Sequence, residues 1–148
     1  MAPVRILLVE DDASDEPLTR RALERDLVQD AVLVARGGPQ GLDYLFGRGC
    51  YADRDTTEQP QVVLLDVNAP GPGCLDVLQA IRADHRTSLL PVVILTTAQA
   101  EADSLGGYRH GANSYVIKPA DGAELAELVG RLARYWLEVN QRPPADSG

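Results

Sequence analysis

The feature that most constrains this chain is a fivefold alternation of short apolar runs with segments of helical spacing. The apolar runs occupy residues 5–9, 32–35, 62–65, 92–95 and 114–117. Runs of this length, rich in Val, Ile and Leu, predict buried strands, and helices between successive strands make those strands parallel. Right-handed crossovers then favour a doubly wound α/β fold with the strand order 2-1-3-4-5 and helices on both faces.

The segments between and after the apolar runs carry apolar residues at helical spacing. The predicted helices span residues 14–26, 37–46, about 75–81, about 102–110 and 121–139. Ser14 and Asp121 are the expected N-caps of the first and last helix. Gly106 and Gly107 weaken the fourth helix by about 1 kcal/mol each relative to alanine. We expect one domain over residues 1–140, followed by a disordered tail at 141–148.

Composition excludes several classes of partner. The net charge is -8, which argues against a nucleic-acid surface and against docking on anionic lipid. No apolar stretch approaches the roughly 20 residues that span a bilayer. Two cysteines without metal-ligand spacing are typical of a reduced, cytoplasmic protein.

Polar residues follow four of the predicted strands. These residues are Glu10, Asp11 and Asp12, then Asp66, Thr96 and Lys118. Because the carboxyl ends of parallel strands meet at one edge, we expect these side chains to converge there. Three crowded carboxylates repel one another, so protons or a cation must offset their charge. Oxygen ligands in an open loop favour Mg²⁺, which accepts phosphate as a co-ligand and leaves the set near neutrality with Lys118.

A plainer explanation exists for each of these residues taken alone. An acid after a strand often caps the next helix, and this explains Asp12 well. A lysine before proline can be a solvated loop residue. The coincidence of Asp11, Asp66, Thr96 and Lys118 on one edge nevertheless favours a functional site.

The sequence resembles response-regulator receiver domains, which have a flavodoxin-like fold. The resemblance rests on residues 8–12 (LVEDD), 64–70 (LLDVNAP), 91–98 (PVVILTTA) and 111–119 (GANSYVIKP), in the order of the family. Residues 49–51 and 135–137 are similar to the subgroup that partners bacterial phytochrome kinases. The resemblance therefore implies a phosphoacceptor signalling protein of a two-component system that catalyses only its own phosphorylation and dephosphorylation.

The resemblance also implies residue roles. Asp66 would accept the phosphoryl group and bind Mg²⁺ together with Asp11, with Glu10 through water and with the backbone carbonyl of Asn68. Lys118 would pair with the phosphoryl group. Thr96 would move toward it, Tyr115 would turn inward as the aromatic switch, and the Lys118–Pro119 bond would be cis. These roles agree with the chemistry of carboxylate nucleophiles and phosphoryl transfer.

One departure from the family pattern keeps alternatives open. Residues 71–74 read Gly-Pro-Gly-Cys, so Cys74 occupies the usual glycine position before the third helix. A degenerate receiver that binds a partner without phosphorylation is one alternative. A phosphatase of haloacid dehalogenase type is a weaker one, because Asn68 replaces the second aspartate of its motif. A flavin binder is disfavoured, since the acidic loop after the first strand would repel phosphate.

The resemblance implies a sensor histidine kinase as partner, a bacterial phytochrome in the narrower subgroup. A histidine phosphotransfer protein is a second candidate. The last predicted helix carries Tyr135, Trp136 and Leu137 near its end, which suggests a homodimer surface. The same stripe is also consistent with Trp136 closing the core of a monomer.

Overall fold

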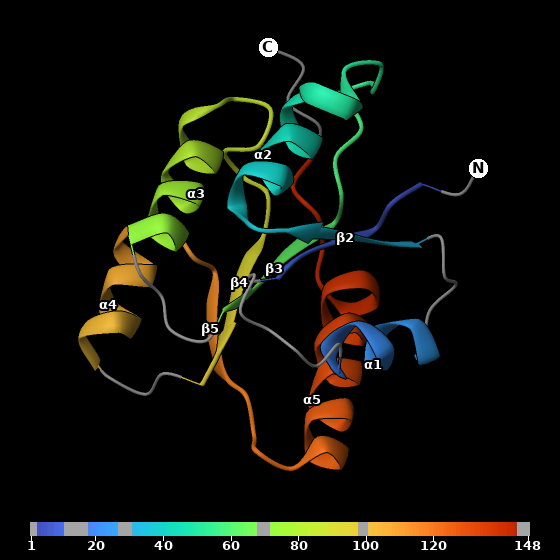
Figure 1. Cartoon of the computed structure of the whole chain (residues 1–148), viewed down its shortest axis with the longest axis vertical. Helices are drawn as coiled ribbons and strands as arrows, with labels where there is room; N and C mark the ends of the chain where they lie inside the picture. The colour runs from blue at the N-terminus through green and yellow to red at the C-terminus, as the bar shows by residue number, and fades with distance from the viewer. Residues whose placement is uncertain (1–2, 11–17, 27–30, 68–71, 98–100, 145–148) are drawn as a thin grey trace.

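The computed structural model describes residues 3–10, 18–26, 31–67, 72–97 and 101–144. Within them, a five-stranded parallel sheet has the order β2-β1-β3-β4-β5, which confirms the predicted topology (Figure 1). The strands are β1 (Ile6–Glu10), β2 (Val32–Arg36), β3 (Val62–Val67), β4 (Val92–Thr96) and β5 (Ser114–Ile117). Each of them overlaps the apolar run that predicted it.

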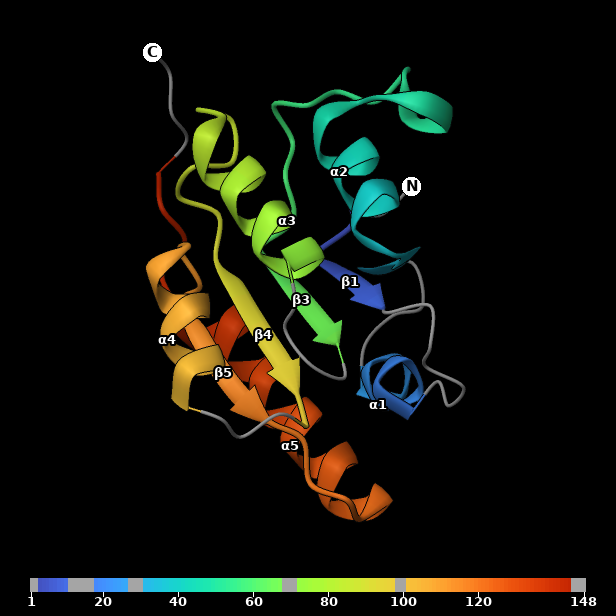
Figure 2. The ribbon, with the colours of Figure 1, turned by 60° about the vertical axis from the view of Figure 1, so that its left-hand side comes forward.

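Helices cover both faces of the sheet, as predicted. They are α1 (Leu18–Asp26), α2 (Gly38–Phe46), α3 (Pro72–Ala83), α4 (Glu101–Arg109) and α5 (Gly122–Arg134). Helix α1 packs against α5 on one face, while α2 packs against α3, and α3 against α4, on the other (Figure 2). The Asp121 side chain caps α5 by accepting hydrogen bonds from the backbone of Ala123 and Glu124. The predicted cap Ser14 lies outside the described residues.

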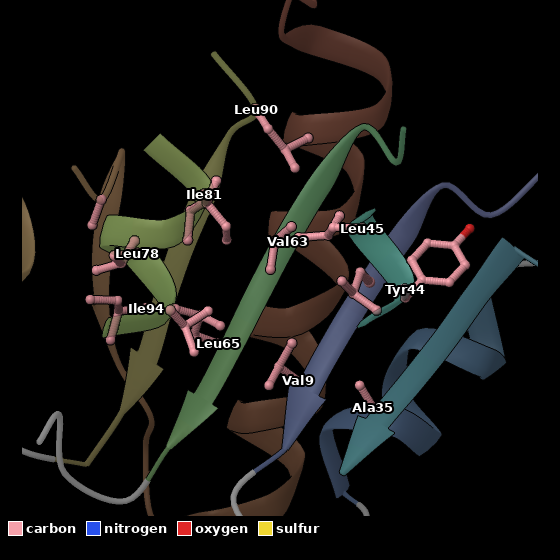
Figure 3. Packing of buried hydrophobic residues seen from close by; sticks show 14 residues of the cluster. Val9, Ala35, Tyr44, Leu45, Val63, Leu65, Leu78, Ile81, Leu90 and Ile94 are labelled. Carbon is pink, nitrogen blue, oxygen red and sulfur yellow. The ribbon is translucent and has the colours of Figure 1, made fainter. Parts of the chain in front are cut away.

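The core has two layers because side chains alternate across a strand. In β3, Val63 and Leu65 pack on the side of α2 and α3 (Figure 3), whereas Val62 and Leu64 pack toward α1 and α5. All four are almost completely buried. This two-sided burial explains why the central strands are apolar at every position rather than at alternate positions.

The last helix differs from its prediction. The α-helical part ends at Arg134 and continues as a π-helical turn, η3 (Tyr135–Val139). Asn140 donates its backbone N–H to Tyr135 O at 2.7 Å, five residues back. Trp136 and Leu137 pack against the core, whereas Tyr135 and Val139 are exposed. The wider π-helical turn occurs where packed and exposed side chains separate in this way. A regular spacing of 3.6 residues per turn does not predict such a turn.

The connection between α2 and β3 is irregular apart from the short 3₁₀ turn η2 (Gly49–Tyr51). Arg54 organises it by donating hydrogen bonds to Tyr44 O at 2.6 Å and Glu58 O at 2.7 Å. Its guanidinium carbon also lies 4.0 Å from the centre of the Tyr44 ring. Among the described residues, no helix is long and apolar enough to cross a membrane.

Candidate functional site

Polar side chains at the carboxyl ends of three central strands are almost completely buried. Glu10 ends β1, Asp66 lies one residue before the end of β3, and Thr96 ends β4. Their exposed fractions are 2%, 4% and 0%. Glu10 and Asp66 are direct partners in the β1–β3 register, and Thr96 is the partner of Val67. The register therefore brings these three residues to one edge of the sheet.

Lys118 follows β5 and reaches Asp66 past the end of β4. Its Nζ donates a hydrogen bond to Asp66 Oδ1, which makes an ion pair with both side chains largely buried. The Lys118 backbone N–H donates to Thr96 O at 2.7 Å and so extends the β4–β5 pairing by one residue. This backbone contact fixes the base of the lysine side chain. A buried carboxylate needs such a partner, because an unpaired buried charge is strongly unfavourable.

Arg36, which was not among the residues predicted from the sequence, completes the edge on the side away from Lys118. It ends β2 and is the register partner of Glu10. Its Nη1 lies 3.4 Å from Glu10 Oε2. The sequence does contain an indication of this pair. A basic residue, Arg36, ends the second strand, just as acidic residues end the neighbouring first strand. Among the described residues, two cations thus flank two neighbouring carboxylates along this edge.

Thr96 and Tyr115 lie on the same face of the sheet. Thr96 is the register partner of Ile117 in β5, so Tyr115, two residues earlier, points to the same side. Tyr115 is partly buried against the core layer that includes Ile94. Gly107 of α4 makes room for it, because a Cβ there would lie 3.4 Å from Tyr115 Cδ2 and 2.8 Å from Ile94 Cδ1.

Part of the predicted metal set lies outside the described residues, namely Asp11 and Asn68, as does Asp12. Within the described part of the chain, no group of three or more His, Cys, Asp or Glu side chains is placed to hold a metal. Glu10 and Asp66 are the two predicted ligands that the structure describes. Their neighbouring buried carboxylates offer the hard oxygen donors that Mg²⁺ prefers, so the described part of the set fits this ion.

The structure also describes the Lys118–Pro119 peptide bond and the position of Cys74. The implied cis Lys118–Pro119 bond is wrong, because the described residues contain no cis peptide bond and this bond is trans, the lower-energy isomer. Helix α3 begins at Pro72, which places Cys74 in its first turn. Burial raises the pKa of the Cys74 thiol to about 11. Cys74 is therefore a protonated, partly buried thiol at neutral pH rather than a reactive thiolate.

A cavity of about 340 Å³ lies at the other end of the strands, away from Asp66. Its lining includes Arg86, Leu90, Pro91 and Arg142. The guanidinium groups are engaged locally, since Arg86 pairs with Asp84 and Arg142 donates to Gln59 O. The buried charged groups of the carboxyl edge, rather than this cavity, mark the candidate site.

The chain matches the family model described as the response regulator receiver domain over residues 6–130. It is 30% identical over 143 residues to response regulator Rcp1 of Synechocystis, covering 97% of this chain and 95% of that protein. The structure of the phosphorylated cyanobacterial phytochrome response regulator RcpA matches with a TM-score of 0.81 and 32% identity, covering 96% of this chain and 99% of that one. The structure of Mn²⁺-bound Rcp1 matches with a TM-score of 0.78 and 30% identity, covering 95% and 99%.

These matches extend over nearly the whole chain and agree with the sheet order described above. Receiver domains are signalling modules of two-component systems, and the relatives named here are response regulators. The chain belongs to the response-regulator receiver family.

Proposed function

We propose that Asp66 is the phosphoacceptor of this receiver and takes its phosphoryl group from a phosphohistidine of a sensor kinase. The carrying observation is the buried Asp66–Lys118 ion pair beside Glu10 at the carboxyl edge. In the transfer, a carboxylate oxygen of Asp66 forms a bond to phosphorus as the phosphorus–nitrogen bond breaks, and the histidine nitrogen keeps the electron pair. The Lys118 ammonium offsets negative charge on the phosphoryl oxygens.

Mg²⁺ is the proposed cofactor, held by Glu10, Asp11, Asp66 and the carbonyl of Asn68. When bound, it supplies positive charge that the phosphoryl oxygens need during transfer. The support within the described residues is the pair of buried carboxylates in register. The structure of a relative, Rcp1, contains bound Mn²⁺, which supports the proposal that this chain also binds a divalent ion.

Thr96 and Tyr115 are the proposed switch. New negative charge at Asp66 draws the Thr96 hydroxyl toward it and vacates space on the face that Tyr115 shares. Because Gly107 has no side chain, α4 packs directly against the Tyr115 ring, and a movement of the ring would displace the helix. The two states then differ in the surface formed by α4, β5 and α5.

The proposed partner is a histidine kinase, and a bacterial phytochrome is the favoured class because RcpA is a phytochrome response regulator. A histidine phosphotransfer protein is a second proposed partner. The receiver would occupy residues 1–140, catalyse no reaction beyond its own phosphorylation and dephosphorylation, and work in the cytoplasm. Free thiols at Cys50 and Cys74 agree with a reducing compartment.

Incubation with acetyl phosphate and Mg²⁺ tests the phosphoacceptor. We expect a labile acyl phosphate on the wild type and on Asp76→Asn, which changes an exposed aspartate of α3. We expect none on Asp66→Asn. Intact-mass spectrometry at neutral pH, before and after hydroxylamine treatment, measures both outcomes.

Each other outcome points to a different function. Labelling that survives in Asp66→Asn would contradict the assignment. A wild type that never carries phosphate would support a degenerate receiver, and steady release of phosphate without a retained adduct would support a phosphatase.

We also propose a homodimer through η3 and the end of α5. Tyr135 and Val139 are exposed apolar side chains there, next to the packed Trp136. Sedimentation velocity should show a dimer that Tyr135→Asp abolishes. The matched control is Tyr108→Asp, because Tyr108 is about equally exposed but lies on α4. A wild type that stays monomeric at high concentration would contradict the dimer.

A further inference from the structure

A row of four charges runs along the carboxyl edge of the sheet, and only part of it is explained by phosphoryl chemistry. Lys118 pairs with Asp66, and Arg36 pairs with Glu10 at 3.4 Å. Glu10 is the register partner of both Arg36 and Asp66, so it lies between them. The formal charges of the four side chains sum to zero. The four described charges therefore balance one another, whereas Asp11, the further carboxylate predicted at this edge, lies outside the described residues.

The backbone at Arg36 is held in place by two hydrogen bonds. Its own N–H donates to the side chain of Gln40 in α2, and the next residue, Gly37, donates its N–H to Glu10 O at 2.8 Å. Gly37 has a φ of 97°, a conformation that glycine adopts without strain. These contacts turn the chain from β2 into α2 directly beside Glu10. They fix the base of the Arg36 side chain beside Glu10, while the guanidinium itself remains half exposed.

The two partners differ in their surroundings. The Glu10 side chain is 3% exposed, whereas the Arg36 side chain is 54% exposed. The carboxylate cannot leave the edge without a change in β1, but the guanidinium can swing into water. If a second cation arrives, Arg36 is the member of the pair that can move.

We propose that Arg36 is a positioning residue that competes with the divalent cation for Glu10 and so sets the metal affinity of the site. This inference rests on the proposed function, because it takes Glu10 to be a metal-site residue. Arg36 neutralises Glu10 in the metal-free protein and keeps the buried carboxylates together. Its positive charge then opposes the incoming cation, so Arg36 weakens metal binding while it stabilises the metal-free state.

Removing the positive charge of Arg36 should therefore tighten metal binding. In Arg36→Gln we expect the dissociation constant for Mn²⁺ to fall about tenfold, the size of one nearby charge acting on a divalent ion through water. Arg36→Lys keeps the charge and should stay within about twofold of the wild type. Titration of the full chain followed by the electron paramagnetic resonance signal of free Mn²⁺ measures affinity without reference to phosphorylation.

Arg48→Gln is the matched control. Arg48 is 58% exposed and pairs with Asp43 at 3.6 Å, but it follows the far end of α2. The substitution changes the net charge equally, so its Mn²⁺ affinity should remain close to that of the wild type. Equal affinities for Arg36→Gln and Arg48→Gln, or weaker binding by Arg36→Gln, would overturn the inference.

A measurement on the wild type tests the same inference without depending on the folding of any variant. The Arg36 Nε–Hε resonance should shift and exchange faster with water when Mg²⁺ is added, because the guanidinium leaves Glu10. A resonance that stays unchanged at saturating Mg²⁺ would overturn the inference and leave the proposed function intact. Absence of any metal binding by the wild type would instead contradict the proposed function, and this inference with it.

Discussion

Replacing Lys118 with methionine is expected to lower the free energy of unfolding by about 3–5 kcal/mol, measured by urea denaturation without Mg²⁺. The substitution leaves the Asp66 carboxylate buried without its counter-charge. The loss is made worse by Glu10, whose carboxylate lies on the neighbouring strand in direct register. Removal of one partner of a buried ion pair is costly because the other charge stays out of water.

The same reasoning predicts an asymmetry between the two partners. Asp66→Ala loses the ion pair with Lys118 but also removes the repulsion between Asp66 and Glu10. It should therefore lower the free energy of unfolding by less than Lys118→Met does. The double variant Asp66→Ala/Lys118→Met should recover most of the stability, because no unpaired charge remains. Mg²⁺ should also offset the loss in Lys118→Met, since it supplies positive charge to the same carboxylates.

A double-mutant cycle gives the coupling energy of the pair. The control is the Glu127–Arg131 pair on α5, which has a 3.1 Å contact but side chains that are 67% and 64% exposed. Its coupling should be at most about 0.5 kcal/mol. A coupling for Asp66–Lys118 no larger than this would contradict the view that the pair is a buried, energetically important part of the site.

Much of the site could be predicted because strand direction determines where strand ends meet. Once 62–65 and 92–95 are identified as parallel strands, Asp66 and Thr96 must lie at one edge. Apolar runs identify such strands well, since central parallel strands are buried on both faces.

Other features depend on contacts that the sequence pattern does not encode. The Arg36–Glu10 pair requires knowing the register of β2 against β1, which places the two residues side by side. The π-helical turn after Arg134 depends on how Trp136 and Leu137 meet the core. Arg54 holds the loop before β3 by donating hydrogen bonds to backbone carbonyls. Every residue has a backbone carbonyl, so the sequence does not reveal which ones Arg54 contacts.

A second large effect is expected at Arg82, far from the charged edge. Arg82 lies in the last turn of α3 and donates to Gly111 O, Leu90 O and the Asn113 side chain, with distances of 2.7–2.9 Å. Burial lowers the pKa of its guanidinium, which nevertheless stays charged at neutral pH. One side chain thus ties α3 to the connection before β4 and to the turn before β5.

The Asn113 side chain extends this network into the sheet. Its Oδ1 also accepts a hydrogen bond from Val92 N at 2.8 Å, and Asn113 N donates to Val92 O at 2.8 Å. Gly111, with a φ of 109°, turns its carbonyl toward Arg82 in a conformation that suits glycine. The start of the β4–β5 pairing therefore depends on groups that Arg82 orients.

Arg82→Met should lower the free energy of unfolding by about 3 kcal/mol, because several partly buried acceptors lose a charged donor at once. Arg82→Lys should recover only a minor part, since an ammonium cannot serve the separated acceptors that the planar guanidinium reaches together. Arg131→Met on the exposed face of α5 is the control and should change stability by less than about 0.5 kcal/mol. Hydrogen exchange at Asn113 and Val92 should accelerate in Arg82→Met beyond the global change. A loss below about 1 kcal/mol would show that water replaces the guanidinium and that Arg82 does not hold these elements together.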